Sequence, residues 1–483
     1  MAQRKQSIVL FPFMAQGHII PFLALALHLE QRKNYNITII NTSLNIKKLR
    51  TSLPPHSSIN LLEIPFKSSD HGLPPNTENT DVIPYNLVIR LLEASTSMRP
   101  AFNKLIQNII DQQQQQQLCI IADIFFGWTA SVAKQLGVFH VIFSGCSGYG
   151  LACYCSLWMN LPHRRVDSDH FSLPDFPEAR AIHRTQLPNN ISEADGVDPW
   201  SLFQSKNLSE WVNSDGFLFN TVEDFDSVGL RYFTRKFGRP AWAIGPVLLS
   251  TGSGSRGKGG GINPELCHEW LNTKPSNSVL FVCFGSMNTI SASQMMQLGM
   301  ALERSGKNFI WVVRPPIGFD INSEFRAEEW LPEGFMEKIK ESKRGLIVHD
   351  WAPQVEILSH EAVSVFLSHC GWNSVLESLS HGVPILGWPM AAEQFFNCKL
   401  LEEEVGVCVE VARGKSCEVK HEDIVAKIEL VMNETENGMK MRKKAGLVRD
   451  MIRNALKDED SFKGSSVRAM DEFLSAAAIA YCP

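Results

Sequence analysis

The sequence predicts an α/β fold built from two parallel sheets, each flanked by helices. Short apolar runs alternate with segments of helical periodicity in both halves of the chain, a pattern typical of parallel strands joined by crossover helices. A stretch rich in glycine and serine, residues 250–263, separates the halves and carries too little apolar surface to form a core. The length of 483 residues suits two or three domains, and we expect two.

Individual elements follow from the apolar runs. In the first half, the predicted strands are Ile8–Phe11, Ile37–Ile40 and Leu118–Asp123, and the predicted helices are Ile19–Gln31 and Thr129–Leu136. In the second half, the predicted strands are Val279–Phe284, Phe309–Val313 and Leu346–Val348, with a helix at Ala292–Arg304. This organisation is that of two Rossmann-like halves.

The segment that follows residue 362 predicts a strand, a turn and a helix in succession. Apolar residues that alternate with smaller or polar ones indicate a half-buried strand: Val363, Val365 and Leu367. The chain then turns into a helix with the apolar face Val375, Leu376 and Leu379, and this helix ends at Gly382 and Pro384.

A helix that begins directly after a strand presents backbone N–H groups and the positive end of its dipole, which together favour an anion. His369, Asn373 and Ser374 lie at this point and would add side-chain donors suited to a diphosphate. A structural alternative exists, in which Asn373 or Ser374 caps the helix and Ser374 forms a capping box with Glu377. These residues by themselves do not decide between the two interpretations.

His18 and Asp123 form a second candidate constellation. His18 follows the first predicted strand, and Asp123 ends the strand that begins at Leu118. Because polar groups and ligands collect at the carboxyl ends of parallel strands, we expect the two side chains at one sheet edge. A histidine supported by an aspartate is the usual arrangement of a general base, whereas the alternatives are a structural histidine and a helix-capping aspartate.

The 44 residues from Trp351 to Gln394 closely resemble the signature segment of the plant family 1 UDP-dependent glycosyltransferases, which act on secondary products. Flanking motifs extend this resemblance over essentially the whole chain. It implies the GT-B fold, with two Rossmann-like domains whose parallel sheets face each other across a cleft. The implied domains are an acceptor-binding domain at 1–249, a linker or loop at 250–263, a UDP-sugar-binding domain at 264–460, and a last helix within 461–483 that packs back on the first domain.

The resemblance also implies a donor site. Trp351 would stack on uracil, Gln354 would help to hold the uridine, and Glu377 would bind the ribose hydroxyls; Ala352 belongs to the same site. The diphosphate would be held by His369, Asn373, Ser374 and Ser286, although Ser286 at a strand end is also explained as a simple cap. Trp372, Glu393 and Gln394 would face the sugar. The terminal glutamine resembles that of glucose-using members, whereas Glu393 stands where many relatives have aspartate.

The motifs FPFMAQGHIIP and IIADIFFGW carry His18 and Asp123 and match the family. By this resemblance, His18 would deprotonate the acceptor and Asp123 would hold the imidazole. The acceptor oxygen would then attack the sugar from the face opposite UDP, with inversion and without a metal or a cofactor other than the co-substrate UDP-glucose. The implied acceptor is a hydroxyl or carboxyl group of a flavonoid, another phenolic, a terpenoid or a hormone. The alternatives are a transferase that uses another UDP-sugar and a non-catalytic binding protein.

Aromatic residues of the first half are candidates for the acceptor pocket, although each is equally explained as core: Phe13, Phe125, Phe126, Tyr149, Trp158 and Phe217. The glycine pattern at 252–257 resembles a dinucleotide fingerprint without the strand and helix that a fingerprint requires, so it does not support a dehydrogenase.

Composition narrows the partners. The net charge is −5 and no long basic run occurs, so nucleic acid is not an expected partner. The 11 cysteines include no C-x-x-C pair, which argues against a disulfide framework or a zinc site and fits a reducing cytosol. No apolar run of about 20 residues occurs to span a bilayer. We therefore expect a cytoplasmic monomer that binds a UDP-sugar and a small-molecule acceptor.

Overall fold

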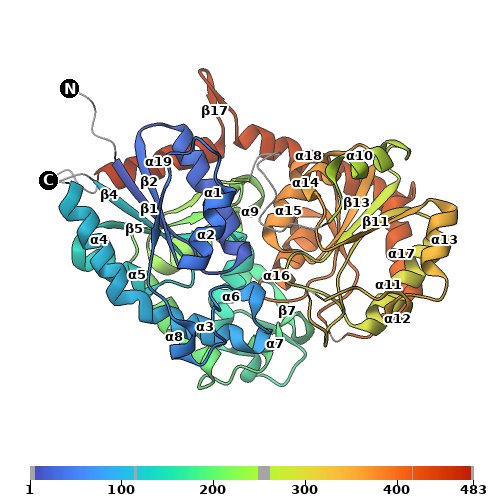
Figure 1. Cartoon of the computed structure of the whole chain (residues 1–483), viewed down its shortest axis with the longest axis horizontal. Coiled ribbons are helices and arrows are strands. Elements are labelled where there is room, and N and C mark those ends of the chain that lie inside the picture. The colour runs from blue at the N-terminus through green and yellow to red at the C-terminus, as the bar shows by residue number, and fades with distance from the viewer. Residues whose placement is uncertain (1–5, 114–116, 249–260, 322, 416, 480–483) are drawn as a thin grey trace. The chain divides into compact units, whose positions relative to one another are not determined.

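The computed structural model describes residues 6–113, 117–248, 261–321, 323–415 and 417–479. These residues form two compact units (Figure 1). Unit 1 comprises the described residues within 1–182, 190–257 and 454–483, and unit 2 comprises those within 183–189 and 258–453. Most of the linker expected at 250–263 lies outside the described residues, which omit 249–260.

Unit 1 is built on a parallel sheet with the strand order β3-β2-β1-β4-β5-β8-β9. The strands are β1 (Gln6–Phe11), β2 (Tyr35–Asn41), β3 (Asn60–Glu63), β4 (Leu118–Asp123), β5 (Phe139–Ser144), β8 (Gly216–Phe219) and β9 (Ala241–Ala243). The longer helices of the unit are α1 (Gln16–Gln31), α2 (Ser43–Ser52), α3 (Val88–Ser95), α4 (Arg99–Gln113), α5 (Trp128–Leu136), α6 (Gly148–Asn160), α8 (Pro199–Glu210), α9 (Glu223–Phe237) and α19 (Ser465–Ile479).

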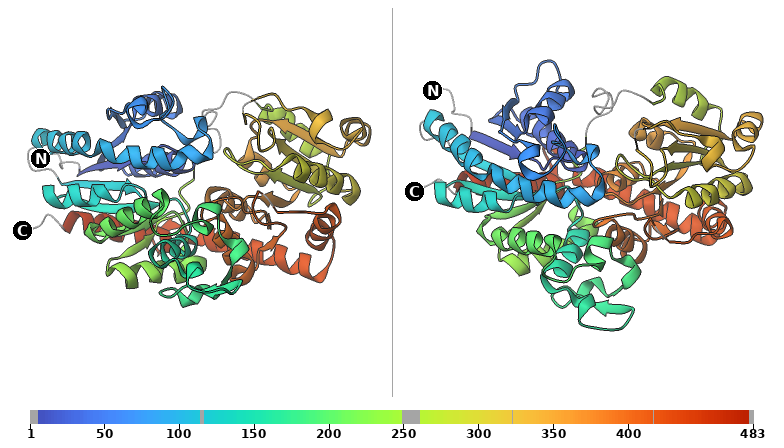
Figure 2. Two further views of the ribbon diagram at one scale, coloured as in Figure 1. Left: turned by 90° about the horizontal axis from the view of Figure 1, so that it is seen from below. Right: turned by 60° about the horizontal axis from the view of Figure 1, so that its bottom comes forward.

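Helices cover both faces of this sheet (Figure 2). Ile8 and Leu10 of β1 belong to one apolar cluster, whereas Val9 and Phe11 belong to another. Successive side chains of a strand point to opposite faces, so the two clusters are the two sides of the sheet. This double burial explains why β1 is an uninterrupted apolar run rather than an alternating one.

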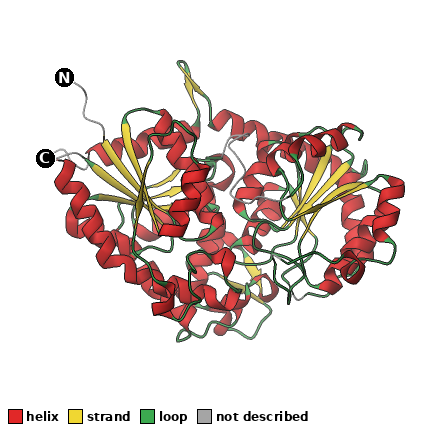
Figure 3. Cartoon of the chain, in the orientation of Figure 1, coloured by secondary structure: helices red, strands yellow, loops and turns green. Residues whose placement is uncertain are grey.

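Unit 2 repeats the arrangement with the strand order β12-β11-β10-β13-β14-β15, also parallel. Its strands are β10 (Val279–Cys283), β11 (Asn308–Val313), β12 (Gly345–His349), β13 (Val363–Ser368), β14 (Ile385–Gly387) and β15 (Cys408–Glu410). Its longer helices are α10 (Pro264–Asn272), α11 (Ala292–Ser305), α13 (Phe335–Ser342), α14 (Gln354–Ser359), α15 (Trp372–Ser380), α16 (Gln394–Lys399) and α17 (His421–Met432). The long helix α18 (Glu436–Ala455) ends the unit. Figure 3 shows the strands of each unit between helices, so the predicted α/β class with two parallel sheets is confirmed.

The last helix of the chain completes the core of unit 1. Four buried residues of α19 join the cluster on the Ile8 side of the sheet: Met470, Phe473, Leu474 and Ala477. The ring of Phe473 lies 5.7 Å from that of Trp242, and Asp471 accepts a hydrogen bond of 2.7 Å from Arg32, the C-cap of α1. A segment more than 200 residues distant in sequence from β9 thus belongs to the same core.

None of the helices in the described ranges combines the length and apolar character needed to cross a bilayer.

Phe473→Ala tests the contribution of α19. Because Phe473 is fully buried, its removal should lower the free energy of unfolding of unit 1 by about 3–5 kcal/mol through lost burial and a residual cavity. Urea unfolding followed by tryptophan fluorescence measures this change. Glu472→Ala, an exposed change on the same helix, is the matched control. Equal effects of the two substitutions would contradict the assigned packing.

Candidate active site

The polar pair of unit 1 lies where the carboxyl ends of β1 and β4 meet. His18 lies in the first turn of α1, which begins three residues earlier than the sequence predicted, and Asp123 is the last residue of β4. The Nδ1 atom of His18 lies 2.8 Å from Oδ2 of Asp123. Because a carboxylate only accepts, Nδ1 carries the hydrogen, and Nε2 is the nitrogen able to take up a proton. The expected proximity of the two residues is confirmed.

Asp123 is fixed by a second contact. Its side chain is 1% exposed, and Oδ1 accepts a hydrogen bond of 3.1 Å from the backbone N–H of Phe125. The side chain of His18 is 24% exposed, so the imidazole reaches solvent while its supporting carboxylate does not. This is the geometry of a proton-accepting histidine oriented by a buried aspartate.

The aromatic candidates for an acceptor pocket divide into two groups. Phe126, Tyr149, Trp158 and Phe217 are at most 5% exposed and belong to the core. Phe13 and Phe125 flank the imidazole of His18, with ring centroids 5.6 and 5.3 Å from it. Phe125 is half-buried, so it is the aromatic candidate that combines contact with His18 and access to a ligand.

In unit 2, α15 begins at Trp372 and takes Gly371 as its N-cap, without a side-chain cap. The alternative in which Asn373 or Ser374 caps this helix is therefore wrong, because both residues lie inside its first turn. They therefore lie at the helix start that follows β13, the end of a helix at which the dipole is positive. The strand, turn and helix lie in the order that the sequence predicted.

His369 is held between two glycines beside this helix start. A methyl group on Gly371 would lie 2.4 Å from Nε2 of His369, and one on Gly285 would lie 2.7 Å from Cε1, so larger residues are excluded on both sides. Burial and the charge of Lys415 lower the pKa of His369 to about 4, so the imidazole is neutral near pH 7. Its buried Nδ1 has no hydrogen-bond partner in the described part of the chain. A phosphate oxygen would satisfy that nitrogen.

Three further residues of the predicted donor site form one hydrogen-bonded group. The carboxamide of Gln354, at the start of α14, donates to Oγ of Ser374 at 3.0 Å and to Oε2 of Glu377 at 2.7 Å. Glu377 is 3% exposed and Ser374 is 8% exposed. These contacts of Gln354 orient the side chains of Ser374 and Glu377 on α15.

The loops after β10 and β12 are joined by Arg314, a residue that the sequence interpretation did not single out. Its guanidinium donates to the backbone carbonyl of Ser286 at 2.8 Å and to that of Asp350 at 2.7 Å. Arg314 is 7% exposed, and burial lowers the pKa of its side chain. The half-buried Trp351 and the buried Ala352 follow Asp350 directly. One buried cation thus connects the loop of Ser286 with the loop of Trp351.

The loop after β14 is held by Gln394 and contains Glu393, two residues that the sequence analysis assigned to the sugar. The carboxamide oxygen of Gln394 accepts from the backbone N–H groups of Met390 and Ala391, both at 3.0 Å. Its Nε2 group is therefore the part of the side chain suited to a ligand. Glu393 accepts a hydrogen bond of 3.2 Å from Asn397, which also donates to the backbone carbonyl of Cys370 at 3.0 Å.

Asn397 was also not anticipated from the sequence, and it connects the turn before α15 with the start of α16. Trp372 is 3% exposed, so its side chain is buried. Unit 2 therefore brings the predicted donor-site residues to strand ends and helix starts of one sheet.

Comparison with known proteins identifies this arrangement. Residues 255–445 match the family described as UDP-glucoronosyl and UDP-glucosyl transferase. The chain is 55% identical to UDP-glycosyltransferase 92A1 of Arabidopsis thaliana, over 99% of this chain and 98% of the relative. It is 42% identical to crocetin glucosyltransferase 3 of Crocus sativus, over 90% and 92%, and 36% identical to scopoletin glucosyltransferase of Nicotiana tabacum, over 93% and 94%.

Solved structures agree with these relatives. The structure of UGT73P12 of Glycyrrhiza uralensis, complexed with glycyrrhetinic acid 3-O-monoglucuronide, matches with a TM-score of 0.84 and 28% identity, over 99% of this chain and 96% of the other. The structure of UGT71G1 of Medicago truncatula, complexed with UDP-glucose, matches with a TM-score of 0.78 and 25% identity, over 99% of each chain. The fold is GT-B, and the chain belongs to the plant family 1 UDP-dependent glycosyltransferases, enzymes that transfer a glycosyl group from a UDP-sugar.

Proposed function

We propose that this enzyme transfers glucose from UDP-glucose to a hydroxyl or carboxyl group of a small lipophilic plant metabolite, with inversion at the sugar carbon. The observation that carries the proposal is the 2.8 Å contact between His18 and the buried Asp123 in a member of this family. Relatives named for glucosyl transfer to crocetin and scopoletin support glucose as the sugar and a lipophilic acceptor. The alternative is that this enzyme uses a different UDP-sugar as its donor.

In the proposed reaction, Nε2 of His18 takes the proton of the acceptor O–H group. The acceptor oxygen forms a bond to C1 of glucose while the bond from C1 to the diphosphate oxygen breaks, and UDP leaves with the electron pair. Asp123 accepts a hydrogen bond from Nδ1 throughout and stabilises the positive charge that develops on the imidazole. No covalent intermediate on the enzyme is needed. Half-buried Phe125 would contact the acceptor beside His18.

The donor is proposed to bind unit 2 through groups that the fold already orients. Trp351 and Ala352 would contact uracil, and Glu377, oriented by Gln354, would accept from the ribose hydroxyls. His369, as a neutral donor, would meet the diphosphate together with Ser286 and the N-terminal turn of α15, which includes Asn373 and Ser374. Trp372, Glu393 and Gln394 would complete the sugar end.

We also propose that the reaction needs no metal ion and takes place in the cytoplasm. The helix start and His369 would stabilise the negative charge of the departing diphosphate, so that no metal cation is required. The cysteines in the described ranges are thiols, which fits a reducing compartment.

A turnover assay tests the proposed reaction. The enzyme is incubated with UDP-glucose, a chelator and a pooled panel of phenolic, terpenoid and carboxylic acceptors, and products are identified by mass spectrometry. We expect an acceptor that has gained one hexose in β linkage. Transfer of a different sugar from a matched panel of UDP-sugars, or a strict need for added metal, would contradict the proposal.

His18→Ala should lower turnover by about a hundredfold or more, as expected for loss of a general base, while UDP affinity stays unchanged. Asp123→Asn should also lower turnover, because an amide cannot stabilise the imidazolium as a carboxylate does. Steady-state kinetics and calorimetric UDP titration measure the two effects. His56→Ala, an exposed histidine of the same unit, is the control. Near-normal turnover of His18→Ala would contradict the assignment of His18 as the general base.

Arg314→Met should weaken UDP binding by about tenfold or more, because two carbonyl groups lose charged hydrogen-bond donors and the loops they hold are released. Methionine retains much of the apolar stem. Calorimetric titration with UDP measures the loss, and kinetics should show a larger change in KM for UDP-glucose than in kcat. Arg304→Met, an exposed change on α11, is the matched control. Unchanged UDP affinity would show that Arg314 does not position the donor loops.

Gln394→Glu and Gln394→Ala separate two roles of one side chain. Glutamate retains an oxygen for the N–H groups of Met390 and Ala391 but loses the amide donor, whereas alanine loses both. If Nε2 contacts the hexose, the affinity of both variants for UDP-glucose should fall at least about tenfold more than their affinity for UDP. Only alanine should also lower thermal stability. Equal losses for UDP and UDP-glucose would place Gln394 away from the sugar.

A further inference from the structure

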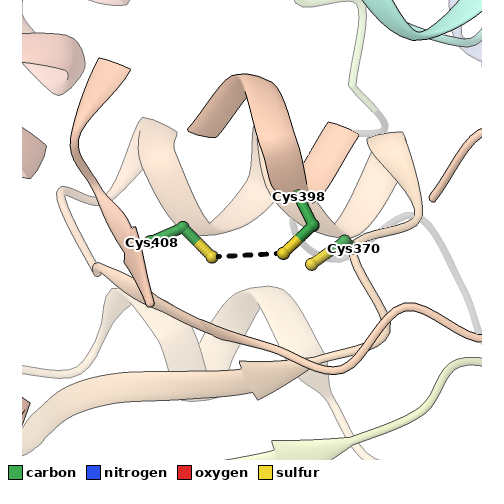
Figure 4. Close-up of side chains that lie close together, drawn as sticks. All are labelled: Cys370, Cys398 and Cys408. Carbon is green, nitrogen blue, oxygen red and sulfur yellow. Dashed lines mark hydrogen bonds between the residues drawn. The ribbon is translucent and has the colours of Figure 1, made fainter. Parts of the chain in front are cut away.

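Three cysteines from separate elements of unit 2 converge in its core (Figure 4). Cys370 lies in the turn between β13 and α15, Cys398 lies on α16, and Cys408 begins β15. All three side chains are buried, and their sulfur atoms lie within 4.8 Å of one another. The Sγ atoms of Cys398 and Cys408 are 3.8 Å apart. The proposed donor and acceptor sites make no use of these thiols.

A glycine allows the three sulfur atoms to lie close to the neighbouring strand. A methyl group on Gly387, the last residue of β14, would lie 2.5 Å from Sγ of Cys398, 3.0 Å from that of Cys408 and 3.1 Å from that of Cys370. The three sulfur atoms therefore all pack directly against the backbone of β14, and any side chain larger than hydrogen at position 387 would displace them.

The spacing of the sulfur atoms is that of ligands around one ion. Metal–thiolate bonds of about 2.3 Å place neighbouring sulfur atoms of a tetrahedral site about 3.8 Å apart. The distance between Cys398 and Cys408 has this value. The Sγ atom of Cys370 lies within 4.8 Å of both of them.

The donor set selects the kind of ion. Sulfur ligands bind soft ions such as Cu(I) and zinc and not the hard ions Mg²⁺ or Ca²⁺. Structural zinc takes four ligands, whereas the group in the described chain contains three, each one a thiol. Cu(I) is satisfied by two or three sulfur atoms and requires neither a fourth ligand nor water.

We propose that Cys370, Cys398 and Cys408 form a buried binding site for Cu(I). As each cysteine forms its copper–sulfur bond, its S–H bond breaks and the proton passes to solvent. No electron is transferred, because copper enters and remains as Cu(I). The proposal concerns the fold of unit 2 and does not rest on the proposed sugar or acceptor.

The test is a competition for Cu(I) between the full chain and the coloured chelator bicinchoninate, under reducing and oxygen-free conditions. We expect the protein to withdraw one equivalent of Cu(I), with a sulfur-to-copper absorption band in the near ultraviolet. The double variant Cys398→Ala, Cys408→Ala should lose this equivalent. The matched double variant Cys153→Ala, Cys155→Ala, two buried cysteines on α6 of unit 1, should retain it.

Two results would overturn the proposal: a wild-type chain that withdraws no copper, or a Cys398, Cys408 variant that withdraws as much as the wild type. X-ray absorption at the copper edge of the loaded wild-type chain is an arm that does not depend on the folding of any variant. Three sulfur neighbours at about 2.3 Å support the site, whereas nitrogen, oxygen or fewer sulfur neighbours refute it.

Discussion

Parallel pairing of the central strands determines where the loops that carry most of the proposed site residues lie. In unit 1, Phe11 of β1 pairs with Ala122 of β4, so the residues that follow each strand leave the sheet at the same edge. In unit 2, Cys283 of β10 pairs with Ser368 of β13, which brings the loop of Ser286 beside His369. In each unit the functional side chains lie just beyond strands whose interiors are apolar and buried. The sheets provide rigid positions, and the loops after them provide the chemistry.

Hydrogen bonds from buried polar side chains fix the conformation of those loops. Arg314 and Gln394 each hold two backbone groups, and Asn397 holds the backbone carbonyl of Cys370 and the side chain of Glu393. An unpaired carbonyl or N–H group in the interior would be costly. These contacts do for the donor loops what Asp123 does for His18. They fix a side chain or a loop before a ligand arrives, so less conformational entropy is lost on binding.

The sequence predicted those parts of the molecule that depend on local pattern. Apolar runs located the central strands within two residues, and the rule that parallel strands end at one edge predicted the contact of His18 with Asp123. The first residue of α15 was harder to predict, because Gly371, Asn373 and Ser374 are all acceptable N-caps. Only the backbone geometry selects the glycine.

Contacts between segments that are distant in the sequence could not be predicted from local patterns. Arg314 follows an ordinary strand, and nothing in its neighbours indicates that it will span two loops 64 residues apart, from Ser286 to Asp350. The three cysteines are separated by 28 and 10 residues and show no ligand motif, so only the packing of α16 and β15 against the turn at Cys370 reveals the cluster.

The position of α19 in the core of unit 1 has a consequence for synthesis of the chain. Unit 1 begins with β1, but its Ile8-side cluster lacks Met470, Phe473, Leu474 and Ala477 until the ribosome has passed residue 477. Unit 2 has all of its residues by 453. At about 5–20 residues per second, the first sheet must wait roughly 10–45 s after residue 257 for its final helix. The half that starts first is therefore completed last, and during that interval the apolar face awaiting α19 is a natural surface for a chaperone.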